Sequence, residues 1–184
     1  VERELNVLAP HEPWPVSETA AALHQQSVIA DLHADTFLWD RDPRERADRG
    51  HVDLVRLREG NVAVQVFAVV TKSPAGQNYD ANTAGSEKIT PAGVALSIRR
   101  AVEVVGEDQV ALGSDWDGST TVTFDASELT APTQALLGEG LAPDVIHKVM
   151  GENLVEFLAK HLPETEEERL TFADESNDNV QSLR

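Results

Sequence analysis

The segment that most constrains the fold is a run of ten residues, 61–70 (NVAVQVFAVV), in which β-branched and other apolar residues are almost uninterrupted. A strand with one face in water alternates apolar and polar residues. A strand in a parallel sheet is covered on both faces and is apolar nearly throughout. The run therefore predicts a buried strand of a parallel sheet. Parallel strands need crossover connections, usually helices, so this segment favours the α/β class.

The remaining segments supply strands and helices in the order that this class requires. Two further strands are predicted at 27–35 and 110–114. Cap residues and apolar periodicity predict helices at 18–26, 90–105, 131–137 and 143–161. Around a single α/β domain at 17–162, we expect an extended proline-containing arm at 1–16 and an acidic, frayed tail at 163–184. The 184 residues are fewer than the roughly 250 of a closed eight-stranded barrel.

Composition excludes several classes of function. The chain has 15 Lys and Arg against 32 Asp and Glu, a net charge of −17, which argues against nucleic acids and anionic membranes as partners. It has no cysteine, so disulfides, thiolate zinc sites and cysteine nucleophiles are excluded. No apolar run is long enough to predict a membrane span. The compartment stays open, with the cytoplasm favoured. Metal cations and small substrates are compatible with this charge.

Two polar clusters follow predicted strands, at the strand ends where α/β proteins bind ligands. His33 and Asp35 are two residues apart and therefore lie on the same side of their strand. Imidazole nitrogen and carboxylate oxygen together suit Zn²⁺ or a similar divalent metal. Asp115 and Asp117 follow the 110–114 strand, where a carboxylate can act as a general base beside a metal.

Other interpretations of the same residues stay open at this stage. Asp35 can cap the turn after its strand, and Asp117 with Gly118 can simply form a turn. The Asp115-x-Asp117 spacing also resembles the nucleophile motif of haloacid-dehalogenase-type phosphatases, with Asp115 attacking phosphorus and Asp117 as the acid. That family also needs an acidic pair at a later strand end, which this sequence does not contain.

Four segments in order resemble the renal (membrane) dipeptidase family, a branch of the metal-dependent hydrolases built on (β/α)₈ barrels. They are 29–36 (IADLHADT), 51–62 (HVDLVRLREGNV), 110–118 (VALGSDWDG) and 149–154 (VMGENL). The resemblance implies a zinc-dependent dipeptidase in which metal-activated water cleaves the peptide bond of a dipeptide. It assigns His33 and Asp35 to the first zinc ion, and it makes Asp115 the group that transfers the proton.

The sequence departs from the family in the middle of the barrel. The family takes a bridging glutamate from its third strand and two histidines from middle strands, whereas here only 84–88 (AGSEK) separates the second-strand region from the helix before the eighth strand. We therefore expect the eighth, first and second strands plus helices, with one Zn²⁺ or none in place of two. The same pattern fits a non-catalytic remnant or binding module with a weak metal half-site. The unpaired outer edges of such a sheet predict a homo-oligomer.

Overall fold

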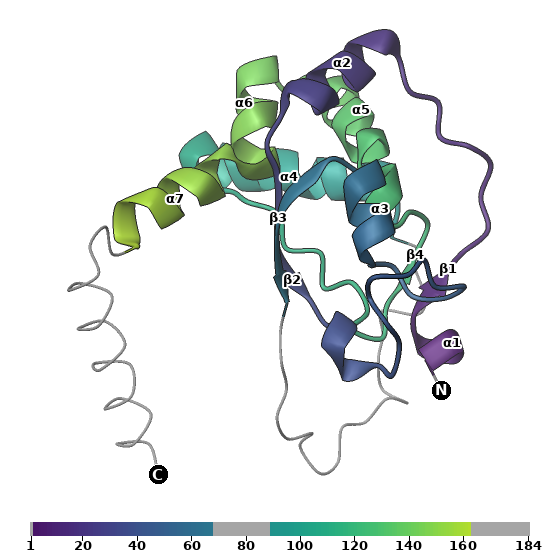
Figure 1. The fold of residues 1–184 in the computed structure, drawn as a ribbon. Coiled ribbons are helices and arrows are strands. Elements are labelled where there is room, and N and C mark those ends of the chain that lie inside the picture. Colours follow the sequence, from purple (N-terminus) through teal and green to yellow (C-terminus); the bar gives the residue numbers. More distant parts are fainter. Residues whose placement is uncertain (1, 68–88, 163–184) are drawn as a thin grey trace. The chain divides into compact units, whose positions relative to one another are not determined.

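The computed structural model describes residues 2–67 and 89–162 and forms two compact units, residues 1–153 and 154–184 (Figure 1). Helices of the first unit are α1 (Glu2–Leu5), α2 (Glu18–Gln26), α3 (Leu54–Glu59), α4 (Pro91–Val105), α5 (Thr130–Gly138) and α6 (Pro143–His147). Its short turns are η1 (Thr36–Leu38), η4 (Glu107–Gln109), η5 (Ala126–Glu128) and the π-helical η6 (Lys148–Glu152). Its strands are β1 (Val7–Leu8), β2 (Ile29–Ala34), β3 (Val62–Phe67) and β4 (Thr121–Val122). Helix α7 (Asn153–His161) supplies most of the described part of the second unit.

The strand order confirms parallel pairing and a mixed helix–strand architecture with small parallel sheets. Strand β2 pairs in parallel with β3, from Ile29 opposite Val62 to Ala34 opposite Phe67 (Figure 1). Along its other edge, β2 is bridged in parallel to residues 112–116. The central strand of this arrangement is therefore β2, between residues 112–116 and β3. The last three residues of the predicted 61–70 strand lie outside the described residues.

The prediction of a strand at 110–114 is wrong, because this segment forms only isolated bridges. The segment follows β2 through the Leu32 N–H, which donates to the Leu112 carbonyl (3.0 Å). The backbone ladder is then interrupted, because the Ser114 N–H donates to a carboxylate oxygen of Asp31 (2.7 Å) instead of a carbonyl. A side chain thus replaces part of the ladder, and only isolated bridges form.

The first residues also differ from the extended arm that the sequence suggested. Residues 2–5 form the short helix α1, and β1 pairs in parallel with β4. The Val7 N–H donates to the Thr120 carbonyl (3.1 Å), and the Asn6 side-chain oxygen accepts the Ser119 N–H (2.8 Å). This pairing joins residues more than a hundred positions apart, so local sequence gives no sign of it. The division into 1–16, 17–162 and 163–184 stays a prediction, and residues 163–184 lie outside the described part.

The helix starts follow their predicted caps. The side chain of Ser17 accepts the Ala20 N–H (3.1 Å) at the start of α2. Thr90 accepts the Gly93 N–H (3.1 Å) at the start of α4, with Pro91 in its first turn. These caps satisfy backbone donors that have no partner within the helix.

The helix expected at 143–161 is broken into α6, η6 and α7. Gly151 has an extended, non-helical backbone inside η6. A Cβ atom at this position would come 2.1 Å from the Val28 carbonyl oxygen, so the chain packs against the start of β2 only because residue 151 is glycine.

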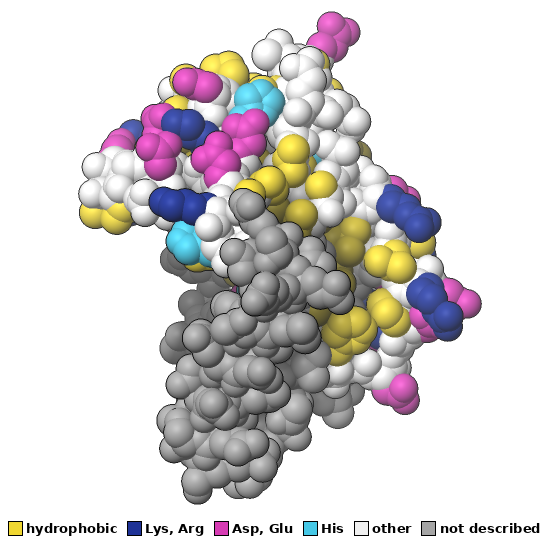
Figure 2. Space-filling model, turned by 60° about the vertical axis from the view of Figure 1, so that its left-hand side comes forward, with side chains coloured by type: hydrophobic (Ala, Val, Ile, Leu, Met, Phe, Trp, Pro, Cys, Tyr) yellow, Lys and Arg dark blue, Asp and Glu magenta, His cyan; other side chains and the backbone are white. Residues whose placement is uncertain are grey.

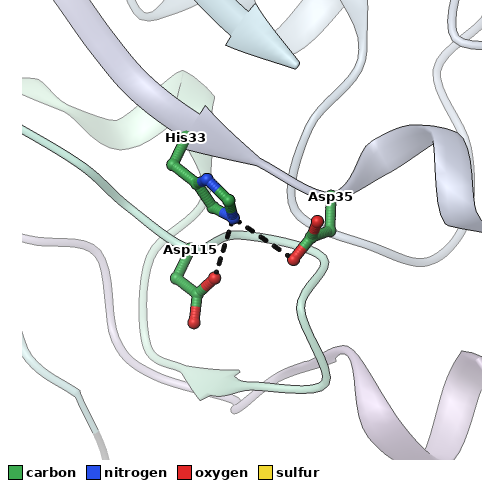
Figure 3. A group of neighbouring side chains, drawn as sticks. All are labelled: His33, Asp35 and Asp115. Carbon is green, nitrogen blue, oxygen red and sulfur yellow. Dashed lines mark ion pairs between the residues drawn. The ribbon is translucent and has the colours of Figure 1, made fainter. Parts of the chain in front are cut away.

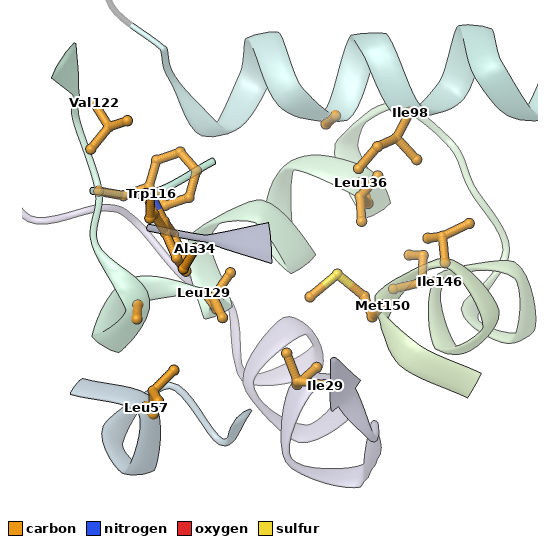
Figure 4. Packing of buried hydrophobic residues seen from close by; sticks show 14 of the residues in the cluster. Ile29, Ala34, Leu57, Ile98, Trp116, Val122, Leu129, Leu136, Ile146 and Met150 are labelled. Carbon is orange, nitrogen blue, oxygen red and sulfur yellow. The ribbon is translucent and has the colours of Figure 1, made fainter. Parts of the chain in front are cut away.

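One hydrophobic core joins the sheet and the helices of the first unit (Figure 4). Among its fully buried side chains are Ile29, Leu136, Ile146 and Met150. Figure 2 shows that hydrophobic side chains also reach the surface on one face of the molecule. Among the described residues, no helix combines the length and the apolar character needed to cross a bilayer.

His24 is fully buried, although a lone histidine on a short helix is more often a surface residue. Its Nε2 donates to the Gly60 carbonyl (3.0 Å), and its Nδ1 lies 2.9 Å from the Thr133 hydroxyl oxygen. Burial lowers the pKa of His24, and the hydrogen bond with the Gly60 backbone opposes that shift. The folded protein therefore favours neutral His24.

This shift predicts that the free energy of unfolding falls as the pH drops below about 6.5, because the unfolded chain then binds more protons than the folded one. Urea unfolding at about pH 7.5 and about pH 5.5 measures the effect. His24→Gln should reduce the difference between the two pH values, whereas His161→Gln, at an exposed position, should not. An unchanged pH dependence in His24→Gln would contradict the assignment.

Candidate metal centre

Three side chains that could bind a metal converge at the carboxyl end of β2 (Figure 3). His33 belongs to β2, Asp35 begins the turn into η1, and Asp115 follows residues 112–114 on the neighbouring segment. The Asp115 N–H donates to the His33 carbonyl (3.1 Å), and the Asp35 N–H donates to the Trp116 carbonyl (2.8 Å). These two backbone hydrogen bonds fix the side chains at one edge. The structure thus brings together the three residues selected from the sequence.

The separations of His33 Nε2 from the two carboxylates match those of neighbouring ligands on a tetrahedral metal. His33 Nε2 lies 3.5 Å from Asp35 Oδ2 and 3.3 Å from Asp115 Oδ1, and the three ligand atoms lie within 4.8 Å of one another. Zinc–ligand distances of about 2.0–2.2 Å and tetrahedral angles place neighbouring ligand atoms roughly 3.4 Å apart. An N–H···O hydrogen bond is usually shorter, about 2.7–3.2 Å. The residues present therefore fit a zinc ion or a similar divalent metal.

The group is open to solvent on one side. The side chains of His33 and Asp115 are 46% and 63% exposed, whereas that of Asp35 is 14% exposed. The pKa of Asp115 is raised, mainly by partial desolvation and further by the negative charges of Asp35 and Asp31, against the opposing effect of His33. A small ligand can reach the group, while Asp35 is held by its surroundings.

The turn that carries Asp115 has an unusual backbone. Asp115, Asp117 and Ser119 all have positive φ angles, 54°, 62° and 66°. Such angles are uncommon outside glycine, although Asp adopts them more readily than most residues. The Gly118 N–H donates to the Asp115 carbonyl (3.1 Å) and closes the turn.

Gly118 leaves the space in which the two carboxylates approach each other. A Cβ atom at residue 118 would come 2.8 Å from Asp35 Oδ2 and 3.1 Å from Asp115 Oδ1. Contacts under 3.0 Å force a displacement, so a side chain here would push the Asp35 carboxylate out of place. The same Cβ atom would come 2.9 Å from the Asp115 carbonyl oxygen, so a side chain at residue 118 would also disturb the backbone of the turn.

Asp117 does not join the group, although it is two residues from Asp115. Its side chain is fully buried, and its carboxylate accepts hydrogen bonds from the Thr36 hydroxyl (2.8 Å), the His51 N–H (2.7 Å) and the Arg41 guanidinium. A carboxylate so enclosed cannot protonate a leaving group on an external phosphate. The aspartyl-phosphate phosphatase alternative is not favoured for this reason.

His51 is also buried beside Asp117 rather than in the metal group. Its Nδ1 accepts the Asp117 N–H (3.2 Å). Desolvation lowers the pKa of His51, against the opposing charge of Asp117 and a backbone hydrogen bond with Val7.

Sequence reasoning missed Arg41 and Thr36, which hold Asp117 from the loop after β2. Arg41 stands in a charged segment, 40–50, whose composition is typical of solvated surface, so its burial had no local signal. Thr36 directly follows Asp35 in the segment 29–36 (IADLHADT), and this position next to a candidate ligand was the signal that could have found it.

Comparison with known families identifies part of the chain. The model of the membrane dipeptidase family (peptidase family M19) matches residues 79–169, just under half of the 184 residues. The match includes Asp115 and begins after His33 and Asp35, so the likeness of those two residues to the dipeptidase motif rests on their own sequence and geometry. No curated protein matches the chain significantly.

Gly118→Ala tests the packing of the centre. The added methyl group should displace Asp35 and weaken zinc binding at least tenfold, about 1.4 kcal/mol, in isothermal titration calorimetry. Gly138→Ala is the matched control, because a Cβ atom there meets nothing within 4 Å. Equal zinc affinities for the two variants would show that the close approach of the carboxylates does not matter for binding.

Proposed function

We propose that the chain is a zinc-dependent hydrolase of the dipeptidase type, in which His33 and Asp35 hold one zinc ion and Asp115 transfers the proton. The observation that carries the proposal is the spacing of the three donor atoms, within 4.8 Å of one another at one strand end. The family of residues 79–169 supports the reaction class.

The three residues of the centre have different roles because their surroundings differ. When bound, zinc would supply an activated water and polarise the peptide carbonyl. Asp35, the least exposed of the three, fixes the position of the donor set, and His33 offers Nε2 toward both carboxylates. Asp115 Oδ1 faces His33, which leaves Oδ2 to take a proton from the attacking water and return it to the leaving amine. A raised pKa suits a group that must both accept and release a proton.

The strand arrangement supports a barrel origin for this site. Residues 112–116, β2 and β3 are parallel neighbours in the order expected of the eighth, first and second strands of a (β/α)₈ barrel. Within residues 2–67 and 89–162, His33, Asp35 and Asp115 are the one group that could hold a metal. We therefore propose a single half-site, with one zinc ion where the family has two and a severely reduced turnover.

A binding module with the same half-site is the second candidate. The open face of the centre and the single donor group in the described part of the chain favour it. The two candidates share the metal and differ in whether Asp115 acts on a substrate.

Asp115→Asn separates these candidates. If the chain is a hydrolase, Asp115→Asn should abolish the release of amino acids from a panel of dipeptides. It should lower the zinc affinity less than His33→Ala does. His33→Ala should weaken zinc binding at least tenfold. Asp144→Asn, at an exposed position on α6, is the control and should change neither. Zinc binding without hydrolysis in the unaltered chain would favour the binding module, and no zinc binding would overturn both.

Self-association is a further part of the proposal. Among the described residues β3 is paired on one edge only, and its Val66 is 42% exposed. Unpaired apolar strand edges associate readily. We expect light scattering after size exclusion to give a mass above 20.0 kDa at micromolar concentration. A sharp monomer peak together with a cooperative thermal transition would contradict this.

A further inference from the structure

We propose that Arg41 is a positioning residue for the metal centre. Its guanidinium holds Asp117 beneath the turn of residues 115–119 and thereby keeps Asp115 opposite His33 and Asp35. The link to zinc binding rests on the proposed function. The contacts through which Arg41 would position the turn are present without a metal.

Asp117 is the anchor of the turn. Its carboxylate is fully buried and is bound by Arg41, by the Thr36 hydroxyl and by the His51 N–H. Its backbone carbonyl accepts the Trp39 indole N–H (2.7 Å). The loop that follows β2 therefore binds both the side chain and the backbone carbonyl of Asp117. Asp35, one of the metal-binding candidates, begins the same loop.

The turn needs such an anchor because its backbone conformation is uncommon. Three of its five residues have positive φ angles without being glycine. Residues of this kind persist where the surrounding structure holds them in place. One hydrogen bond closes the turn, and backbone hydrogen bonds with His33 and Asp35 join its first two residues to β2 and the residue after it. The Arg41–Asp117 ion pair adds the link between the middle of the turn and the loop that follows β2.

Arg41 has two further polar neighbours besides Asp117. Its Nη1 donates to the Val52 carbonyl (2.6 Å), and its Nε lies 2.9 Å from Glu2 Oε1. Glu2 of α1 also pairs with Arg49 (2.7 Å). The two arginines, Arg41 and Arg49, are therefore balanced by the two carboxylates of Glu2 and Asp117. A buried charge is strongly destabilising when its partner is removed, so the guanidinium and the Asp117 carboxylate depend on each other.

Gly50 provides the room for this ion pair. A Cβ atom at residue 50 would come 2.7 Å from Arg41 Nη2 and 3.0 Å from Asp117 Oδ1. Residue 50 also has a φ angle of +75°, which favours glycine. Backbone conformation and space therefore both select glycine beside the guanidinium.

The chain contains a matched control for a purely structural role. Arg56 is also almost fully buried and pairs with two carboxylates, Asp53 and Asp125. Its remaining side-chain hydrogen bond goes to the Ala47 carbonyl, so its polar partners lie outside residues 33–36 and 115–119. Loss of Arg56 should therefore destabilise the fold without disturbing the metal centre.

The test compares Arg41→Met with Arg56→Met under conditions in which circular dichroism shows both variants folded. Arg41→Met should weaken zinc binding at least tenfold in calorimetry. In the metal-free protein it should speed amide exchange of Gly118 and Asp115 at least tenfold. Arg56→Met should leave both quantities within about twofold while lowering the midpoint of unfolding. If Arg41→Met does not fold, Gly50→Ala, which displaces the guanidinium and keeps its charge, takes its place with the same expectations.

Equal zinc affinity and equal amide exchange in the Arg41 and Arg56 variants would overturn the inference. Faster exchange at Gly118 in Arg41→Met, in a protein that binds no zinc at all, would support the positioning and overturn the proposed function. Because amide exchange is measured without metal, failure of the positioning role of Arg41 can be distinguished from failure of the proposed zinc-dependent function.

Discussion

The buried carboxylate of Asp31 joins the three chain segments on which the rest of the structure depends. It accepts hydrogen bonds from the Ser114 N–H (2.7 Å), from the Ser114 hydroxyl (2.7 Å) and from the Gln65 side chain (2.6 Å). Ser114 lies beside β2 and Gln65 lies in β3, so one side chain of the central strand links both neighbours. A buried carboxylate is costly unless it is fully hydrogen-bonded, and here the partners fix the register that places Asp115 next to His33.

Besides this register, the geometry of the candidate metal centre depends on two glycines and one buried ion pair. Gly118 lets the carboxylates of Asp35 and Asp115 approach, and Gly50 lets Arg41 reach Asp117. The left-handed residues of the turn cost about 1–2 kcal/mol each. The structure offsets this cost through the buried contacts of Asp117. The uncommon backbone angles and one of the three candidate metal donors, Asp115, thus lie in the same five residues, 115–119.

The sequence could predict what depends on local pattern. The apolar run at β3, the caps at Ser17 and Thr90, and the pair His33 and Asp35 at a strand end follow from spacing and residue type. The pairing of β1 with β4 could not be predicted, because it joins distant residues through backbone atoms. The burial of Arg41 could not be predicted either, because its partners come from three separate segments. The helix break at Gly151 depends on a close approach to Val28 that only the fold creates.

We propose that His33 and Asp35 bind one divalent metal ion beside Asp115. Anomalous diffraction at the zinc edge, from crystals grown with zinc, tests it most directly because it locates the ion. We expect one strong peak about 2.0–2.2 Å from His33 Nε2 and from an Asp35 carboxylate oxygen. A peak elsewhere with none at this position, or no peak at all, would contradict it.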